Sequence, residues 1–290
     1  MKMSRELVTV TELCGGISLQ ILDDFSLSGI ANSGQCFRFK ALRDGGYRVI
    51  HEGRVLDMFQ TGQGEYHLNC SKEQFKEIWH SYFDLGECYR ELRERIDPCE
   101  DAFLYRAAES GRGIRILRQN PWEMLISFII SQNRNIPAIC TSIEMLARMA
   151  GKPIQVGDDC EHAFPEPEPL AALTESELRA CKLGYRAEYV SRAAKEVAEG
   201  KLDLTTLARA SDEAAMERLL EVHGIGKKVA SCILLFGYHR LNTFPIDVWI
   251  RRTLEKWYPD GYPFERYAPY NGVYQQYMFA YSRENSDDLA

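Results

Sequence analysis

The sequence predicts an α+β protein in which an N-terminal antiparallel β-sheet domain with helices is followed by an all-helical domain. Three observations predict this fold class. Apolar and polar residues alternate in short segments between Cys36 and Asn69, apolar residues recur at helical spacing after Asn120, and a turn with two glycines joins two helical segments at about 211–236. We therefore predict two domains, at 1–117 and 118–290.

The alternating segments of the first domain are CFRFKAL, YRVIHEG, RVLDMFQ and EYHLNC. An Asp-Gly-Gly sequence at 44–46 separates the first two, and Asp-Gly between alternating segments is a strong β-hairpin signal. Residues 72–95 follow with apolar side chains at helical spacing, Phe75 and Trp79 among them. This pattern predicts antiparallel hairpins and then a helix.

The second domain is predicted to begin at Asn120, because Asn is a good helix N-cap and the following Pro121 suits a first helical turn. The segment PWEMLISFIISQ is apolar on most sides, which predicts a buried central helix. We expect an acidic, proline-rich surface loop at 157–169 and an irregular segment at 258–270. Further helices are predicted at 136–150 (ended by Gly151), 174–182, 187–199 and 272–283.

The turn with two glycines has the sequence HGIG at 223–226. Ser211 or Asp212 is expected to cap the helix before it, and the helix after it should begin at about Lys227 and be capped by Gly237. The two glycines allow positive φ angles and a close approach of the backbone to a ligand. Free N–H groups and the positive end of a helix dipole then favour a bound anion, most simply a phosphate.

Gly-x-Gly alone would favour an ordinary helical hairpin. The charge around it changes this balance, because only two acidic residues accompany six basic ones between Val222 and Trp257. The basic residues are Lys227, Lys228, Arg240, Arg251, Arg252 and Lys256. A local surplus of positive charge beside a phosphate site indicates a nucleic-acid backbone as partner.

The overall charge of −7 and the pI near 5.5 count against a generic DNA-binding protein, so a local basic face must suffice. The apolar runs are too short to span a membrane, and the first residues lack the apolar core of a signal peptide. Nine scattered cysteines indicate a reducing compartment. We therefore expect a cytoplasmic protein.

The segments HGIGKKVASC and FPIDVWI together resemble the helix-hairpin-helix signature of the DNA glycosylase superfamily, and the Lys-Val-Ala-x-Cys sequence is most similar to the 8-oxoguanine DNA glycosylases. The resemblance implies double-stranded DNA containing oxidised guanine as the partner, a monomer, and a place at the bacterial nucleoid. Some related glycosylases hold an iron–sulfur cluster through four cysteines after the hairpin. No cysteine follows Cys232 here, so we expect no cluster.

Lys228 is the expected nucleophile. At a helix N-terminus beside Lys227, its ammonium form is disfavoured, and a neutral amine can form a Schiff base. Lys227 fits the same reasoning, and adjacent helical residues point about 100° apart, so only one of them faces a pocket. The resemblance selects Lys228. It also assigns Asp247, nineteen positions later, a catalytic role, although a helix N-cap is the simpler interpretation of that residue.

The resemblance further implies a pocket for the base. The carbonyl of Gly34 would accept the extra N–H of oxidised guanine, Gln275 would bind the base edge, and Phe279 and Cys232 would stack on its two faces. Gln275 and Phe279 are four residues apart and therefore share one helix face. Simpler interpretations are a turn at Gly34, a core position for Phe279 and a buried small hydrophobe at Cys232.

DNA contacts are implied for Asn133, which would fill the gap left by the extruded nucleotide, and for Tyr185, which would wedge into the duplex. Arg186 would read the opposite base. By composition alone, Asn133 is a helix-end cap and the other two lie in a polar turn. Gly224, Gly226 and Lys227 would contact phosphate.

Two positions depart from the family pattern. A second arginine that reads the opposite base is replaced by Ala138, which leaves the opposite-base preference open. A phosphate-contacting histidine is replaced by Trp249. The two changes together resemble a bacterial branch of the family more than the eukaryotic one.

These observations predict a bifunctional DNA glycosylase and abasic-site lyase that extrudes 8-oxoguanine, excises it through a Schiff base on Lys228 and nicks the strand by β-elimination. The chemistry needs no metal or organic cofactor, although hairpin carbonyls could hold a structural monovalent cation. Two alternatives stay open: a monofunctional 3-methyladenine-type glycosylase, and a non-catalytic helix-hairpin-helix protein that only binds DNA.

Overall fold

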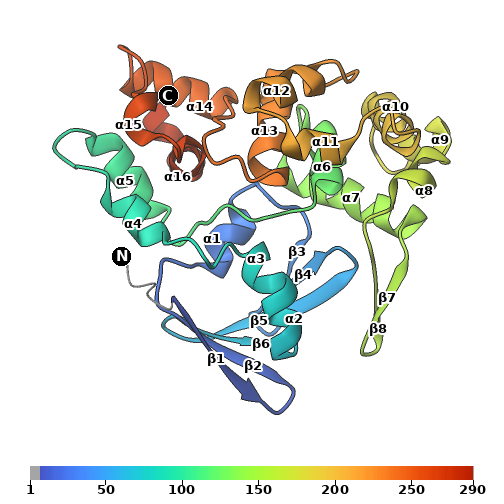
Figure 1. The fold of residues 1–290 in the computed structure, drawn as a ribbon, viewed down its shortest axis with the longest axis horizontal. Coiled ribbons are helices and arrows are strands. Elements are labelled where there is room, and N and C mark those ends of the chain that lie inside the picture. The colour runs from blue at the N-terminus through green and yellow to red at the C-terminus, as the bar shows by residue number, and fades with distance from the viewer. Residues whose placement is uncertain (1–6, 290) are drawn as a thin grey trace. The chain divides into compact units, whose positions relative to one another are not determined.

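The computed structural model describes residues 7–289 (Figure 1). They form two compact units. The first unit contains Met1–Val49, Leu56–Arg118 and Leu241–Ala290, and the second contains Ile50–Val55 and Gln119–Arg240. These units follow internal contacts and not chain order, so the domain limits at 1–117 and 118–290 stay a prediction.

A six-stranded sheet in the order β1-β2-β6-β5-β4-β3 confirms the predicted antiparallel sheet of the N-terminal region. The strands are β1 (Val8–Leu13), β2 (Gly16–Ile21), β3 (Phe39–Ala41), β4 (Tyr47–His51), β5 (Arg54–Gly62) and β6 (Glu65–Leu68). The sequence prediction missed β1 and β2. Most of β1 is exposed at the sheet edge, so its apolar signal is weak.

The first unit also contains α1 (Leu27–Asn32), α2 (Lys72–Gln74), a π-helical turn η1 (Phe75–Trp79), α3 (His80–Tyr82), α4 (Tyr89–Glu94) and α5 (Ala102–Ser110). Phe75 and Trp79 are fully buried against the sheet. The single helix predicted at 72–95 is wrong. The chain leaves the helix after Tyr82, where Asp84 has a left-handed φ of 50°, and only resumes at α4.

The last segment of the first unit forms α14 (Val248–Trp257), α15 (Phe264–Tyr267), α16 (Asn271–Glu284) and η2 (Ser286–Leu289). The helix predicted at 272–283 is confirmed within one residue at each end. The irregular segment predicted at 258–270 contains α15, which has only four residues and no side-chain cap. The helices α14 and α16 pack against each other, and α16 packs against α5.

The second unit is helical, as predicted. It contains α6 (Pro121–Ser131), α7 (Ile136–Ala150), α8 (Pro167–Ala171), α9 (Glu175–Ala180), α10 (Arg186–Ala198), α11 (Leu204–Arg209), α12 (Asp212–Leu220) and α13 (Lys227–Gly237). Asn120 caps α6 through the backbone N–H groups of Trp122 and Glu123, as expected. Nine consecutive residues of α6 are buried, which confirms the central helix.

Two sequence predictions for this unit need correction. The proposed surface loop at 157–169 is partly regular. Its first residues form the turn and the second strand of a hairpin of β7 (Pro153–Val156) and β8 (Asp159–His162), in which Gly157 has a φ of 58°. Gly237 is not a cap but the buried last residue of α13. A Cβ there would lie 3.1 Å from Met124 Cβ, so this glycine permits close packing of α13 on α6.

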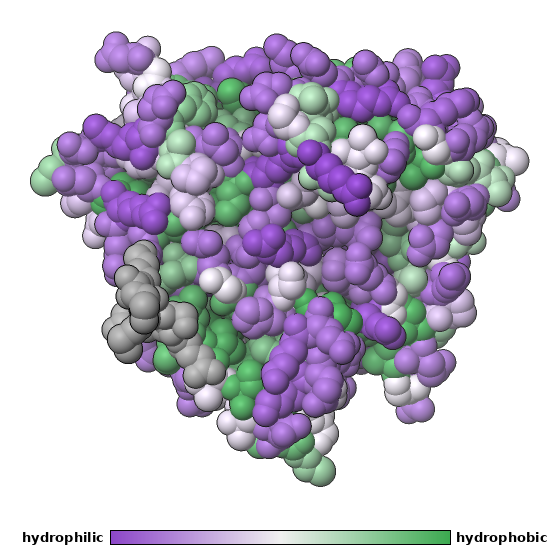
Figure 2. Space-filling view, in the orientation of Figure 1, coloured by the Kyte–Doolittle hydropathy of each residue, from purple (hydrophilic) through white to green (hydrophobic). Residues whose placement is uncertain are grey.

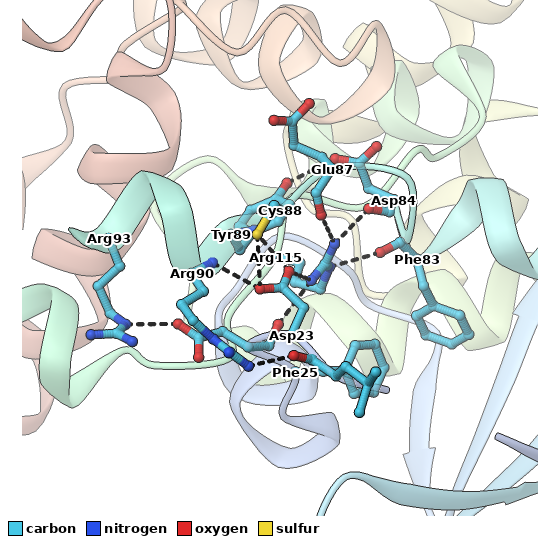
Figure 3. Close-up of polar contacts among 12 residues, drawn as sticks. Asp23, Phe25, Phe83, Asp84, Glu87, Cys88, Tyr89, Arg90, Arg93 and Arg115 are labelled. Atoms are coloured by element: carbon cyan, nitrogen blue, oxygen red, sulfur yellow. Dashed lines mark hydrogen bonds and ion pairs between the residues drawn. The ribbon is translucent and has the colours of Figure 1, made fainter. Parts of the chain in front are cut away.

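A buried polar cluster fixes the loops of the first unit (Figure 3). The Arg115 side chain is inaccessible to solvent, pairs with Asp23 at 2.8 Å and lies 4.2 Å from the centre of the Tyr89 ring. Its remaining N–H groups donate to the backbone carbonyls of Phe83, Asp24, Asp84 and Glu87. The Arg115 charge holds the pKa of Asp23 below its usual value against the opposing effect of burial. Every donor of this buried cation therefore has an acceptor.

The face shown in Figure 2 is covered mostly by polar side chains, with scattered apolar ones between them. None of the helices in the described range 7–289 is long and apolar enough to cross a membrane. None of the nine cysteines, all of which lie within 7–289, forms a disulfide.

Candidate active site

The hairpin predicted from the sequence is formed by α12 and α13, and Ser211 is the N-cap of α12, accepting a hydrogen bond from the Ala214 N–H at 3.2 Å. Gly224 has a φ of 85°, so this position requires glycine. Gly226 differs from the expectation, because its φ of −100° is open to any residue. A Cβ at Gly226 would meet no atom within 4 Å, so this glycine leaves open space before the first turn of α13.

The close approach at the hairpin occurs at Gly224. A Cβ there would lie 2.5 Å from Cγ of Tyr189, whose ring lies against the glycine from α10. Tyr189 also makes edge contacts with the rings of Tyr185 and His223, at 5.7 and 5.1 Å between centroids. Tyr189 could not be identified from the sequence, because nothing in its position on an amphipathic helix distinguishes it from a packing residue.

The two lysines after the turn have different surroundings. Lys227 is exposed, whereas Lys228 is half-buried, with its Nζ 5.6 Å from the centre of the Phe128 ring on α6. Phe128 in turn stacks on Phe236 of α13. Cys232, one turn after Lys228, is buried on the same helix. The fold thus turns Lys228 inward and Lys227 outward, which the sequence alone left open.

Asn133 follows the end of α6 at an exposed position with a left-handed φ of 51°. Asparagine tolerates this conformation better than most residues. The preceding Gln132 is half-buried and donates through Nε2 to the carbonyls of Ile129 and Gly224, at 3.2 and 3.0 Å. Asn135, and not Asn133, caps the next helix through the Ala138 N–H. Asn133 is therefore not the N-cap of α7, but it stands directly after the C-cap of α6 in a left-handed conformation, as asparagine often does at a helix end.

Tyr185 and Arg186 begin α10. Tyr185 is 49% exposed, while Arg186 is 7% exposed and lies 4.3 Å from the Tyr185 ring centre. The Arg186 guanidinium donates to the carbonyls of Gln132, Asn133 and Leu183. Burial and the nearby Arg186 charge lower the pKa of Arg134. The second unit thus concentrates positive charge around the loop that carries Asn133.

In the first unit, Asp247 is the N-cap of α14, and its carboxylate accepts the Ile250 N–H at 2.9 Å. This confirms the simpler of its two interpretations and leaves the catalytic one a prediction. Trp249 is half-buried in the first turn, and Arg251 and Arg252 are exposed beyond it. Arg240 does not belong to this exposed set, because its guanidinium binds Asp212 and two backbone carbonyls within the second unit.

Gln275 and Phe279 lie one turn apart on α16. Gln275 is 4% exposed, and its Nε2 donates to the carbonyl of Pro245, two residues before Asp247. Its Oε1 is buried without a hydrogen-bond partner within the described residues. Phe279 is half-buried, with the Arg283 guanidinium 5.4 Å from its ring centre. A buried amide oxygen without a partner is costly, which indicates a position kept for a ligand.

The turn at Gly34, with a φ of 77°, is attached to the same helix. Gln276 of α16 donates to the Ser33 carbonyl at 2.5 Å. Gln35 fixes the other side of the turn, because its side chain is bonded to Ser33, the Arg115 carbonyl and the Leu117 N–H. Neither Gln35 nor Gln276 could be identified from the sequence, because the partners of both side chains are distant in the chain. The turn at Gly34 is confirmed, and the role of its carbonyl stays a prediction.

Each unit therefore brings part of the predicted residue set together. The second unit joins the hairpin, Lys228, the Asn133 loop and the start of α10, and the first joins Asp247, the Gly34 turn and α16. Within residues 7–289 no three His, Cys, Asp or Glu side chains are arranged to hold a metal ion. A glycine-containing hairpin followed by an inward lysine in the second unit, and a buried amide oxygen one turn from a half-buried phenylalanine in the first, are features of the class of helix-hairpin-helix base-excision proteins.

The chain belongs to the 8-oxoguanine DNA glycosylases of the HhH-GPD superfamily. Residues 19–125 match the 8-oxoguanine DNA glycosylase N-terminal domain, and residues 126–261 match the HhH-GPD superfamily base excision DNA repair proteins. The family and the fold class predicted from the sequence are thereby confirmed.

Two solved structures are similar over nearly their whole length. MBOgg1 in complex with a low-affinity DNA ligand is 36% identical, with a TM-score of 0.90, 96% of this chain and 99% of that chain covered. The Clostridium acetobutylicum 8-oxoguanine glycosylase/lyase, in complex with double-stranded DNA containing cytosine opposite 8-oxoguanine, is 32% identical, with a TM-score of 0.89 and 98% and 100% covered. The Saccharomyces cerevisiae N-glycosylase/DNA lyase is 35% identical over 225 residues, or 73% of this chain. The match spans 57% of the length of this yeast relative, and 64% of the length of the probable N-glycosylase/DNA lyase of Methanothermobacter thermautotrophicus.

Proposed function

We propose that this protein is a bifunctional DNA glycosylase and abasic-site lyase that acts on 8-oxoguanine in duplex DNA. The observation that carries the proposal is the inward position of Lys228 at the start of α13, directly after the open backbone of Gly226. The relatives named N-glycosylase/DNA lyase, and the similar structures with DNA, support the same activity and partner.

The hairpin would hold the DNA backbone. The N–H groups of the first turn of α13 lack intrahelical partners, and the Gly226 N-cap makes no side-chain bond with them. A phosphate would accept these N–H groups and lie beside the exposed Lys227. Asn133 and Tyr185, both exposed, would enter the duplex where the damaged nucleotide leaves the stack. Arg186 would read the opposite base.

The extruded base would be held by α16 and the Gly34 turn. The unpartnered Oε1 of Gln275 would accept a hydrogen bond from the base edge, and Phe279 and Cys232 would contact its faces. The Gly34 carbonyl would accept the N–H that 8-oxoguanine carries at N7 and guanine lacks. These contacts favour the damaged base through hydrogen bonds that an undamaged base leaves unmade.

The reaction would begin when the Lys228 amine attacks C1′ of the deoxyribose. A new C1′–N bond forms while the bond to the base breaks, and the base leaves with the electron pair and takes up a proton. The Asp247 carboxylate would stabilise the positive charge that develops on the sugar. Opening of the sugar gives a Schiff base. Loss of a proton from C2′ then expels the 3′ phosphate by β-elimination, and water releases the lysine.

Borohydride trapping tests the proposal. Reduction of the Schiff base during turnover links the protein covalently to 8-oxoguanine duplex, and we expect this adduct for the wild type and for Lys227→Gln but not for Lys228→Gln. An adduct with Lys228→Gln would overturn the nucleophile assignment. Base release without any adduct would favour a monofunctional glycosylase, and binding without release a DNA-binding protein only.

The proposal also covers the oligomeric state, the cellular location, the cofactor requirement and the opposite-base preference. A monomer at the nucleoid suits an enzyme that acts on chromosomal DNA, and sedimentation of the free protein checks its size.

The chemistry requires no cofactor. A monovalent cation on hairpin carbonyls stays a proposal, tested by duplex affinity in potassium and in tetramethylammonium at equal ionic strength. Duplexes with each base opposite 8-oxoguanine test the preference left open by Ala138.

A further inference from the structure

The loop that carries Asn133 and the phosphate hairpin meet at the Gln132 side chain. Gln132 ends α6, and its amide nitrogen bonds the Ile129 carbonyl of its own helix and the Gly224 carbonyl of the hairpin. One NH₂ group has two hydrogens, so a single side chain can satisfy both acceptors.

The backbone of Gln132 is held independently. Its carbonyl accepts the Arg186 guanidinium, which also donates to the next carbonyl, at Asn133. Arg186 comes from α10, as does Tyr189, whose ring occupies the space beside Gly224. Three segments far apart in the sequence, at 132–133, 185–189 and 223–226, are thus bonded or packed to one another within the second unit.

We propose that Gln132 is a positioning residue that fixes the hairpin, and with it Lys228, relative to the Asn133 loop. Gly224 lies four residues before Lys228. Because α13 begins at Lys227, only Ile225 and Gly226 separate Gly224 from the helix that carries the lysine. A shift of the hairpin therefore carries the lysine with it. Misplacement of a reacting group by about 1 Å can cost on the order of a hundredfold in rate. The catalytic part of this inference rests on the proposed function, and the structural part does not.

The test replaces only the amide. Gln132→Met keeps the length of the side chain and the backbone carbonyl that binds Arg186, and it removes the donor. Gln132→Glu places a carboxylate against two carbonyl oxygens and should act in the same direction more strongly. Gln155→Met is the matched control, because Gln155 is in the same unit and also donates to a backbone carbonyl, that of Gly157 at 2.7 Å.

Hydrogen exchange of the hairpin is the first measurement. The Val222 and Ile225 N–H groups are bonded within the turn, so their exchange reports its opening. Loss of one hydrogen bond should speed exchange of a peptide covering 221–226 about fivefold in Gln132→Met and leave it unchanged in Gln155→Met. Unchanged hairpin exchange in Gln132→Met would overturn the inference, whether or not the protein proves to be a glycosylase.

Single-turnover excision is the second measurement. We expect the plateau rate per trappable enzyme to fall at least about tenfold in Gln132→Met and at most twofold in Gln155→Met. A purely structural role would lower the trappable fraction and leave the rate of the remaining molecules unchanged, which would overturn the coupling to Lys228. If the wild type gives neither release nor adduct, the proposed function fails, and hydrogen exchange alone decides the inference.

Discussion

The two hairpin glycines should respond in opposite ways to the same substitution. At Gly224 an added methyl group meets a φ of 85° and lies 2.5 Å from Tyr189 Cγ. At Gly226 the φ is −100°, and the same methyl group has no atom within 4 Å. Gly224→Ala and Gly226→Ala therefore form a matched pair, two residues apart in one turn.

The expected free energies follow from these geometries. A left-handed conformation costs an L-residue about 1–2 kcal/mol, and forcing a methyl group into packed space costs about 1–3 kcal/mol. Gly224→Ala should therefore lose about 2–5 kcal/mol of unfolding free energy. Gly226→Ala combines a small gain from the unfolded chain with a poorer N-cap, so its change should stay within about 1 kcal/mol.

Urea unfolding of both variants measures the difference. Removing the ring with Tyr189→Ala in the Gly224→Ala background should return the packing part of the loss, measured against Tyr189→Ala alone, but not the conformational part. DNA affinity is a second measurement. The Gly226→Ala protein should stay folded but bind DNA more weakly, because its added methyl group lies where a phosphate would approach. Equal destabilisation by the two substitutions would refute the reasoning.

Four further predictions concern Arg115, His51, Gln275 and Asp247. Arg115→Met should lower the unfolding free energy by about 3–5 kcal/mol in urea melts, because it leaves the Asp23 charge buried without its cation. Burial lowers the pKa of His51 from 6.5 to about 4, although the Glu52 charge opposes this shift. The unfolded chain binds the proton more tightly, so up to about 3 kcal/mol of stability is lost as the pH falls from 6.5 to 4, and His51→Gln should flatten that profile in unfolding measurements. Gln275→Met removes an unpartnered buried oxygen and also the bond from Nε2 to the Pro245 carbonyl, two opposing effects, so the melting temperature should change little while single-turnover excision slows about a hundredfold. Asp247→Asn should keep the α14 cap and the melting temperature while slowing excision at least about tenfold, whereas Asp247→Ala should also cost about 1 kcal/mol of stability.

The elements with strong local signals could be predicted from the sequence. Asn120 before Pro121 gave the start of α6 because the cap and the proline act within one turn. The Asp-Gly turn gave the pairing of β3 with β4 for the same reason. The break after Tyr82 was missed, because the apolar spacing continues through it and no proline interrupts the pattern. What ends the helix there is Asp84, a buried side chain bonded to Tyr89 and Arg118.

The site divides in the same way. Gly224 and Lys228 belong to a contiguous motif, so the turn could be located from the sequence, and the family resemblance selected Lys228 over Lys227. Gln132 and Tyr189 could not be identified, because both meet Gly224 in the turn before α13, which is distant in the sequence and lies 92 positions from Gln132. Choosing between Lys227 and Lys228 depended on which side of α13 is buried, and burial is a property of the packed unit. Contacts over long sequence separations leave no periodic trace in the sequence.

The two helix starts that carry the predicted residues differ in what occupies the positive end of the dipole. In α14 the Asp247 carboxylate accepts the Ile250 N–H, so an internal anion already compensates that end. In α13 the N-cap is Gly226, which has no side chain to do so, and the first turn carries Lys227 and Lys228 but no acidic residue. An external anion therefore gains more at α13 than at α14. This difference explains how a chain with a net charge of −7 can still offer a phosphate site, because the compensation is local to one turn.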